Sequence, residues 1–440
     1  MDKITVQKNH NEYNLQSWSK QGGFTPLVIE KAEGIYMWDT EGNRYTDMSS
    51  QLVNLNVGHG NKEIIEAIKK QADTYCFIGP SYGSDVRGEL AKAIVELMPD
   101  NMAKVFFTNG GADANENAIK MARMYTGRHK IFSRYRSYHG STYGAGNLTG
   151  EPRGYTLQPA MSGFVKFFDP YVYREQIPFE SEAQAATYYV TKLREQVIYE
   201  GADNVAAIVL ETITGSNGII IPPVGYMQGV RDICDEFGIM LICDEVMAGF
   251  GRTGTMFGFE HFGIKPDIVS FAKGVTCGYV QLGGVCVSKD IAEYFNHNML
   301  SCGLTYSGHP LACAAGLACL KYYQDAKILE KVGESGKALG EELEALKEKH
   351  PSVGDVRYIG LFSAIELVKD RDTKEALVPY GKDLDGTMGK INGMLKSKGF
   401  MTYTHENMIL ICPPLIITPE QVKEEMVKVD EVLSEVDKMI

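Results

Sequence analysis

The chain has 440 residues, 44% of them hydrophobic, which is enough for two or three domains with a large core. Its net charge is −12 and it has no Lys/Arg-rich block, so it lacks the basic footprint of a nucleic-acid binder. The N-terminus has no apolar signal core, and no run approaches 18 consecutive apolar residues. We therefore expect a cytoplasmic protein with small charged metabolites, not nucleic acid or membrane, as partners.

The first segment, residues 1–58, contains LVIEKAEGIYMWDTEGNRYTDM, which predicts a hairpin that turns at Thr40–Gly42. We expect it to pack with the C-terminal part of the chain.

Residues 59–325 alternate between strand and helix, the pattern of a sheet with helices on both faces. The predicted strands are AKVFFT, HKIFSR, VAAIVLE, IMLICDE, DIVSFAK and GGVCVS, and the predicted helices include NENAIKMARMY, GYMQGVRDICDEFG and PLACAAGLACLKYY. The fold class is therefore α/β, with a large domain built on a mainly parallel sheet.

Residues 326–440 do not continue the alternation of strand and helix. A Glu/Lys-rich helix at 326–350 precedes two strand-like pieces, YIGLFSAIELV and MILICPPLII, and a charged helix at 419–440. This pattern predicts a smaller α+β domain.

Nine cysteines are scattered along the chain, with an odd total and no C-x-x-C pair. Most lie in apolar runs, so we expect reduced core thiols and no metal site.

Three buried-type strands end in a charged residue: Glu211, Asp244 and Lys273. Carboxyl ends of neighbouring parallel strands converge on the crevice where α/β sheets bind ligands. Singly, each residue has a plainer explanation, because a strand-end lysine reaches water and a strand-end aspartate caps the next helix. Together, an acid and a lysine indicate pyridoxal 5′-phosphate (PLP), which needs a Lys Schiff base and an acidic partner for its ring nitrogen.

Two further segments are consistent with such a site. Gly110, Gly111 and Ala112 lie between a strand and a helix, where small residues leave backbone N–H groups free for a phosphate; a tight turn is the alternative. Tyr138 and His139 follow the next strand, where either an aromatic contact with the cofactor or ordinary packing is expected. GFGRTG at 249–254 begins too late after its strand for a dinucleotide site and is interpreted as a loop.

These residues resemble the class III aminotransferases, PLP enzymes of fold type I. The family's motifs occur in its order: WDTEGNRYTDM, NVGHG, TNGGADANENAIKMAR, YHGST, DEVMAGFGRTG, FAKG, TYSGHPLACAAG and CPPLIIT. The resemblance covers most of the chain.

The resemblance implies that Lys273 carries the Schiff base and moves the proton, and that Asp244 pairs with the pyridine nitrogen. Val246 and Tyr138 are expected on opposite faces of the ring, and Glu211 near the substrate. The phosphate is expected on backbone groups of Gly111 and Ala112. Thr305, in TYSGHP, is similar to the threonine that reaches the neighbouring subunit's phosphate, which implies a homodimer.

Three departures from the family bear on the substrate. The phosphate loop reads G-G-A where the family often has S-G-S/T, and Val53 replaces a bulky aromatic. The stretch MTYTHENMILICPPL also lacks the arginine that many relatives use for the acceptor carboxylate, for which His405, Arg136 or Arg134 are candidate substitutes.

The departures look most like the taurine aminotransferase branch, with taurine as donor, sulfoacetaldehyde as product, and 2-oxoglutarate or pyruvate as acceptor. β-Alanine, 4-aminobutyrate or a diamine are alternative donors. A racemase or aminomutase, or a non-catalytic ligand-binding relative, are alternatives of other classes.

Overall fold

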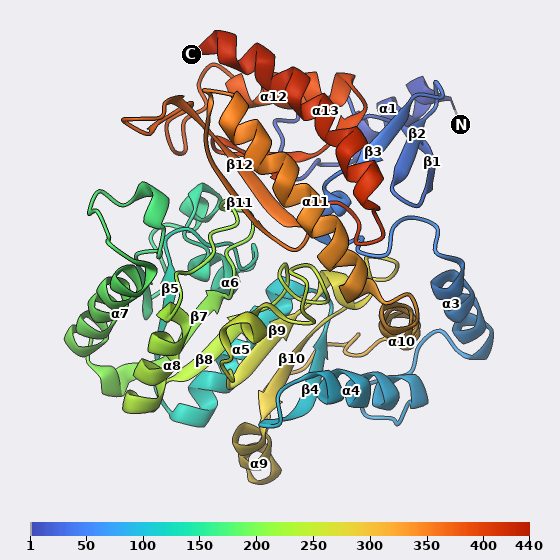
Figure 1. Ribbon diagram of the computed structural model, residues 1–440. Helices are drawn as coiled ribbons and strands as arrows, with labels where there is room; N and C mark the ends of the chain where they lie inside the picture. Colours follow the sequence, from blue (N-terminus) through green and yellow to red (C-terminus); the bar gives the residue numbers. More distant parts are fainter. Residues whose placement is uncertain (1) are drawn as a thin grey trace.

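The computed structural model describes residues 2–440, in which three β-sheets are arranged as a broad lower part and a smaller upper part (Figure 1). The lower sheet has seven strands in the order β4-β10-β9-β8-β7-β5-β6. Their bounds are β4 Met102–Thr108, β5 Lys130–Arg134, β6 Phe164–Phe167, β7 Val205–Glu211, β8 Met240–Asp244, β9 Ile268–Phe271 and β10 Gly283–Ser288. Only β10 is antiparallel to its neighbours, β4 and β9. The predicted fold class is confirmed, and β6 is the strand that the sequence prediction missed.

Helices cover both faces of this sheet because its strands are apolar on both faces. In β7, Ala207 and Val209 pack into a core cluster with α5 and α9, whereas Ile208 and Leu210 pack into another with α7, α8 and α10. The helices are α5 Gly111–Thr126, α7 Glu182–Tyr199, α8 Tyr226–Phe237, α9 Lys289–His297 and α10 Pro310–Asp325, with α3 Lys62–Thr74, α4 Asp85–Leu97 and α6 Tyr143–Leu148 nearby.

The upper part brings both ends of the chain together (Figure 1). One sheet joins β1 Ile29–Glu33, β2 Tyr36–Asp39 and β3 Arg44–Asp47 to β14 Phe400–Met401. The other contains β11 Val353–Ile359, β12 Phe362–Asp370, β16 Met408–Ile411 and β15 Tyr403–His405, with β13 Glu375–Ala376 beside β12. Helices α11 Ile328–Lys349, α12 Thr387–Ser397 and α13 Pro419–Val436 pack in the same part (Figure 1). Helix α1 Lys3–Tyr13 precedes β1, and α2 Ser50–Val53 follows β3.

The hairpin expected at Thr40–Gly42 is present between β2 and β3. The Asp39 carboxylate closes it by accepting bonds from the N–H groups of Glu41 and Asn43, both 2.9 Å. The domain divisions at 58/59 and 325/326 remain predictions.

The GFGRTG segment is a loop whose arginine joins distant parts of the chain. Arg252 is fully buried and donates to Ser50 Oγ (3.0 Å) and Asn56 Oδ1 (2.8 Å), as well as to the carbonyls of Leu361 and Pro413. Its role in the structure is therefore to tie the N-terminal segment and the C-terminal sheet to the large sheet.

Among residues 2–440, none of the helices combines the length and apolar composition that crossing a membrane requires.

Candidate active site

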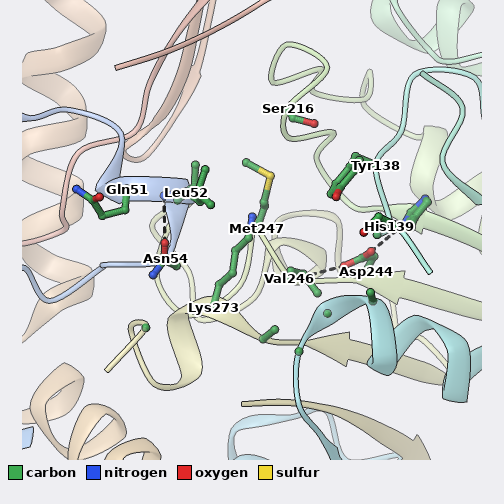
Figure 2. Close-up of a pocket in the computed structure, with 18 of the residues that line it drawn as sticks. Gln51, Leu52, Asn54, Tyr138, His139, Ser216, Asp244, Val246, Met247 and Lys273 are labelled. Atoms are coloured by element: carbon green, nitrogen blue, oxygen red, sulfur yellow. Dashed lines mark hydrogen bonds and ion pairs between the residues drawn. The ribbon is translucent and has the colours of Figure 1, made fainter. Parts of the chain in front are cut away.

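A cavity of about 740 Å³ lies at the carboxyl ends of β7, β8 and β9. Glu211 and Asp244 are register partners, and Asp244 is paired with Ser270, so the strand-end residues meet as expected for neighbouring parallel strands. The predicted residues that line the cavity are Val53, Gly110, Gly111, Ala112, Tyr138, His139, Glu211, Asp244, Val246, Lys273 and His405. Figure 2 shows the Lys273 side chain rising between Leu52 on one side and Asp244 on the other.

Asp244 is held by three donors, two of which, His139 and Val246, appear in Figure 2. Its Oδ2 lies 2.7 Å from Asn115 Nδ2 and 2.7 Å from His139 Nδ1, and its Oδ1 accepts from the Val246 N–H at 3.0 Å. Asn115 is itself fixed by a bond from Ser270 Oγ to its Oδ1 at 2.7 Å. The carboxylate is therefore buried, and these three hydrogen bonds fix its orientation.

Lys273 follows β9 and is half-buried in the cavity wall, with the backbone in the left-handed region at φ 47°. Burial lowers the pKa of its amine to about 8, against the opposing effects of Asp244 and Glu211. At pH 7 an amine with this pKa is neutral in roughly one molecule in ten, against fewer than about one in a thousand for an ordinary lysine, and the neutral form can act as nucleophile and proton carrier.

The N-terminus of α5 forms an anion cradle. The first intrahelical bond runs from the Ala114 N–H to the Gly110 carbonyl (3.0 Å), so the amides of residues 111–113 have no acceptor within the helix. A Cβ on Gly111 would lie 2.9 Å from Val246 Cγ1, so Val246 requires glycine there. The helix end favours negative charge at this position.

Glu211 anchors the loop that carries Tyr138. Its Oε1 accepts from the Tyr138 N–H at 3.0 Å and its Oε2 accepts from the Gly215 N–H at 2.7 Å. Burial raises the pKa of Glu211. Both oxygens are therefore engaged by backbone amides, although the side chain does line the cavity.

Two of the arginines considered from the sequence lie outside this cavity. Arg136 stacks between Tyr171 and Tyr380, with centroid distances of 5.2 and 4.6 Å, and lines a second cavity. Arg134 is fully buried and donates to the Glu211 carbonyl at 3.1 Å. The prediction that either one binds substrate loses its geometric basis, because both are committed to packing elsewhere.

Thr305 is exposed and does not line the cavity of its own chain. Its predicted contact with a partner's phosphate stays a prediction.

The sequence analysis missed Arg153, the arginine among the described lining residues. Its guanidinium lies 4.0 Å from the Tyr138 ring centroid and donates to Ser216 Oγ at 3.0 Å, and it pairs with buried Glu151. Burial lowers the pKa of Arg153, but Tyr403 and Glu151 outweigh this effect, so the net shift is upward. No motif spacing marks this residue, because it lies in a 3-10 helix, Pro152–Leu157, that is too short to set a periodic pattern.

Trp18 was also missed. It lies at the same cavity although its side chain is 63% exposed. Val53 is small, so this tryptophan supplies the large aromatic surface near the entrance. The segment that carries Val53 is unusual, because Ser50, Gln51 and Val53 all have positive φ, which is costly for residues with a side chain.

These features fit PLP. The amides at the start of α5 suit its phosphate, the oriented Asp244 carboxylate suits its ring nitrogen, and Lys273 suits its aldehyde. Buried His139 Nε2 has no hydrogen-bond partner within the described chain, which leaves a polar atom beside the same carboxylate. The fold and the site thus define a PLP-dependent enzyme of fold type I.

Comparison with known proteins identifies the family. The aminotransferase class-III family model matches residues 18–433. A solved structure of taurine:2-oxoglutarate aminotransferase from Bifidobacterium kashiwanohense, in complex with PLP and glutamate, is 52% identical, with a TM-score of 0.97 and coverage of 100% of this chain and 99% of that chain. Taurine–pyruvate aminotransferase from Bilophila wadsworthia is 32% identical, covering 99% of this chain and 98% of that protein. Putrescine–pyruvate aminotransferase from Pseudomonas aeruginosa is 34% identical, covering 90% and 88%.

The chain belongs to the class III aminotransferases and is a PLP-dependent transaminase. Its substrates are an amine donor and a 2-oxo acid. When bound, PLP withdraws electrons from the carbon that bears the substrate's amine and so makes its proton acidic. In the same cavity, Lys273 carries an amine that can hold or pass on a proton, and the Asp244 carboxylate is fixed by its three donors.

Proposed function

We propose that this enzyme transfers the amino group of taurine to 2-oxoglutarate, giving sulfoacetaldehyde and glutamate, with pyruvate as the alternative acceptor. The observation that supports the proposal most directly is the position of Arg153 in the cavity wall. Its guanidinium faces the cavity that holds Lys273 and offers paired N–H donors to a sulfonate or carboxylate. The 52% identity to a taurine:2-oxoglutarate aminotransferase supports the same donor and acceptor.

Arg153 also supplies the positive charge for the acceptor carboxylate that the C-terminal stretch lacks, since that stretch contains no arginine. Donor sulfonate and acceptor carboxylate occupy the site in alternate half-reactions, so one guanidinium serves both. His405, the predicted substitute, lines the cavity too, but its Nε2 is paired with Glu151 Oε2 at 2.9 Å. His405 is therefore a neighbour of the anion site, and Arg153 provides the charge.

A diamine donor is the second candidate, supported by the putrescine relative. It requires an anionic group at the far end of the cavity. The carboxylate of Glu211 is engaged by two backbone amides, and that of Glu151 by Arg153, so the charge in the cavity favours an anionic tail.

The donor test is a screen of taurine, β-alanine, 4-aminobutyrate and putrescine against 2-oxoglutarate and pyruvate. Arg153→Met is expected to reduce kcat/KM for taurine about 10- to 150-fold, because a charge-assisted interaction of about 1.5–3 kcal/mol is removed. Arg136→Met, the matched control outside the cavity, should stay within about two-fold. No consumption of taurine with either acceptor overturns the proposal, and absence of oxo-acid consumption favours the isomerase alternative.

We also propose a cytoplasmic homodimer in which Thr305 completes the partner's phosphate site. In support, exposed aromatic side chains lie beside Thr305: Phe77 and Tyr306 are 44% and 56% exposed, with ring centroids 5.7 Å apart. Such a patch is typical of an interface. Sedimentation of the holoenzyme at twice the chain mass, together with weaker PLP binding by Thr305→Ala, is the expected result; a monomer contradicts it.

A further inference from the structure

The buried carboxylate of Glu151 contacts Arg153, the arginine that lines the cavity. Glu151 is fully buried, and its Oε1 accepts a bond from Arg153 Nε. This contact occupies the inner edge of the guanidinium, while Nη2 donates to Ser216 Oγ at 3.0 Å and the flat face lies on Tyr138. Three contacts therefore fix the orientation of one long side chain, which otherwise has several rotatable bonds.

Glu151 is itself held from the other part of the molecule. Its Oε2 lies 2.9 Å from His405 Nε2, at the end of β15, although their alignment falls short of a directional hydrogen bond. The His405 ring stacks on Tyr403, with an interplanar angle of 12°. The contact thus connects the loop that carries Arg153 with the C-terminal sheet.

We infer that Glu151, buttressed by His405, is a positioning residue that aims the Arg153 guanidinium at the anionic tail of the substrate. The inference rests on the proposed anion-binding role of Arg153. A well-oriented arginine loses less freedom on binding an anion, so preorganisation increases affinity. Because Glu151 is buried, separating its carboxylate from Arg153 costs free energy, since a buried charge without its partner is destabilising.

Orientation and charge predict opposite results when Glu151 is removed. If Glu151 acts only through its negative charge, its loss makes the cavity more positive and anionic donors bind more tightly. If it acts by orientation, Glu151→Ala weakens their binding, and Glu151→Gln largely restores it, because the amide oxygen still accepts from Arg153 Nε.

The experiment measures the donor half-reaction of the holoenzyme by stopped-flow absorbance, without oxo acid. Taurine and β-alanine are the anionic donors, and 1-aminobutane is the donor with an uncharged tail. Glu151→Ala should raise the apparent Kd for the anionic donors about ten-fold or more and that for 1-aminobutane less than about two-fold. Glu151→Gln should stay within about three-fold, and Glu406→Gln, a carboxylate next to His405 bonded instead to the Gly381 N–H, should match the wild type.

A double-mutant cycle separates positioning from general stability. In an Arg153→Met background, Glu151→Ala should cause no further loss of taurine affinity, because its effect passes through Arg153. If Glu151→Ala does not fold, His405→Leu leaves Glu151 in place and should raise the Kd for anionic donors about three-fold. Equal losses for 1-aminobutane and taurine, additivity in the cycle, or tighter binding by Glu151→Ala each overturn the inference. Failure of the proposed function would give a different result, namely a wild-type enzyme that is inactive towards taurine. In that case the Kd for β-alanine still measures the effect of the Glu151 variants.

Discussion

Two adjacent glycines at the start of α5 differ in what surrounds them. A Cβ on Gly111 would lie 2.9 and 3.0 Å from the two γ-methyl carbons of Val246, whereas a Cβ on Gly110 would meet no heavy atom of the chain within 4 Å. Gly110 has φ 177°, an extended backbone that alanine also adopts. We therefore expect Gly111→Ala to destabilise the cofactor-free protein and Gly110→Ala to leave its stability nearly unchanged.

The expected cost follows from the geometry. Contacts near 2.9 Å require Val246 or the start of α5 to move, and forcing a methyl group into packed surroundings costs about 1–3 kcal/mol. Urea unfolding of the cofactor-free protein measures this difference between the two variants. Since the same turn supplies the phosphate amides, PLP titration should also show an affinity about 5- to 150-fold lower for Gly111→Ala.

The variant Val246→Ala tests whether crowding against Val246 causes the loss of stability in Gly111→Ala. It removes both crowded methyl groups, so the double variant Gly111→Ala with Val246→Ala should be destabilised by less than the sum of the single variants. Equal stability of Gly111→Ala and the wild type, or additive losses in the double variant, would refute the steric argument.

The remaining predictions concern the charged residues. Lys273→Ala should abolish turnover and the absorbance of covalently held cofactor; retained activity contradicts its assignment. Asp244→Asn should fold normally but lose turnover by about a thousand-fold, because a charge pair near 4 Å at an effective dielectric near 20 contributes roughly 4 kcal/mol; steady-state assays of both substrates measure it. Burial raises the pKa of Asp437, but bonds from Ser352 and His350 outweigh it and hold the pKa below its usual range. This depressed pKa adds stability that is present above the unfolded pKa of about 3.9 and is lost as pH falls through the folded pKa. The stability difference between wild type and Asp437→Asn in urea should therefore shrink below about pH 4, and a difference independent of pH is the contrary result.

The sequence by itself predicted the large sheet and the meeting of Asp244 and Lys273 at one cavity. The strands that end at Glu211 and Asp244, and β9, which ends two residues before Lys273, are short, apolar and bounded by turn residues, so their burial follows from local pattern. Neighbouring parallel strands bring their carboxyl ends to one edge. The β6 strand was missed because FVKF has four residues, three of them half-buried, and no strong pattern.

One strand predicted near the C-terminus was longer than the strand in the structure. MILICPPLII was read as one strand-like piece, yet β16 ends at Ile411. Pro413 and Pro414 follow closely, and proline has no N–H to continue the ladder.

Only the tertiary structure decided which arginine lines the cavity. Arg136 lies in a bend and Arg153 in the short 3-10 helix Pro152–Leu157, and neither segment has a periodicity that predicts the direction of a side chain. Arg136 turns to a stack of tyrosines, whereas Arg153 turns to the cavity because buried Glu151 and Ser216 hold it there. Glu151 in turn meets His405, far away in the sequence, because the segment after α6 lies against the end of β15. Local pattern therefore specifies the chemistry, and contacts between distant segments specify the substrate site.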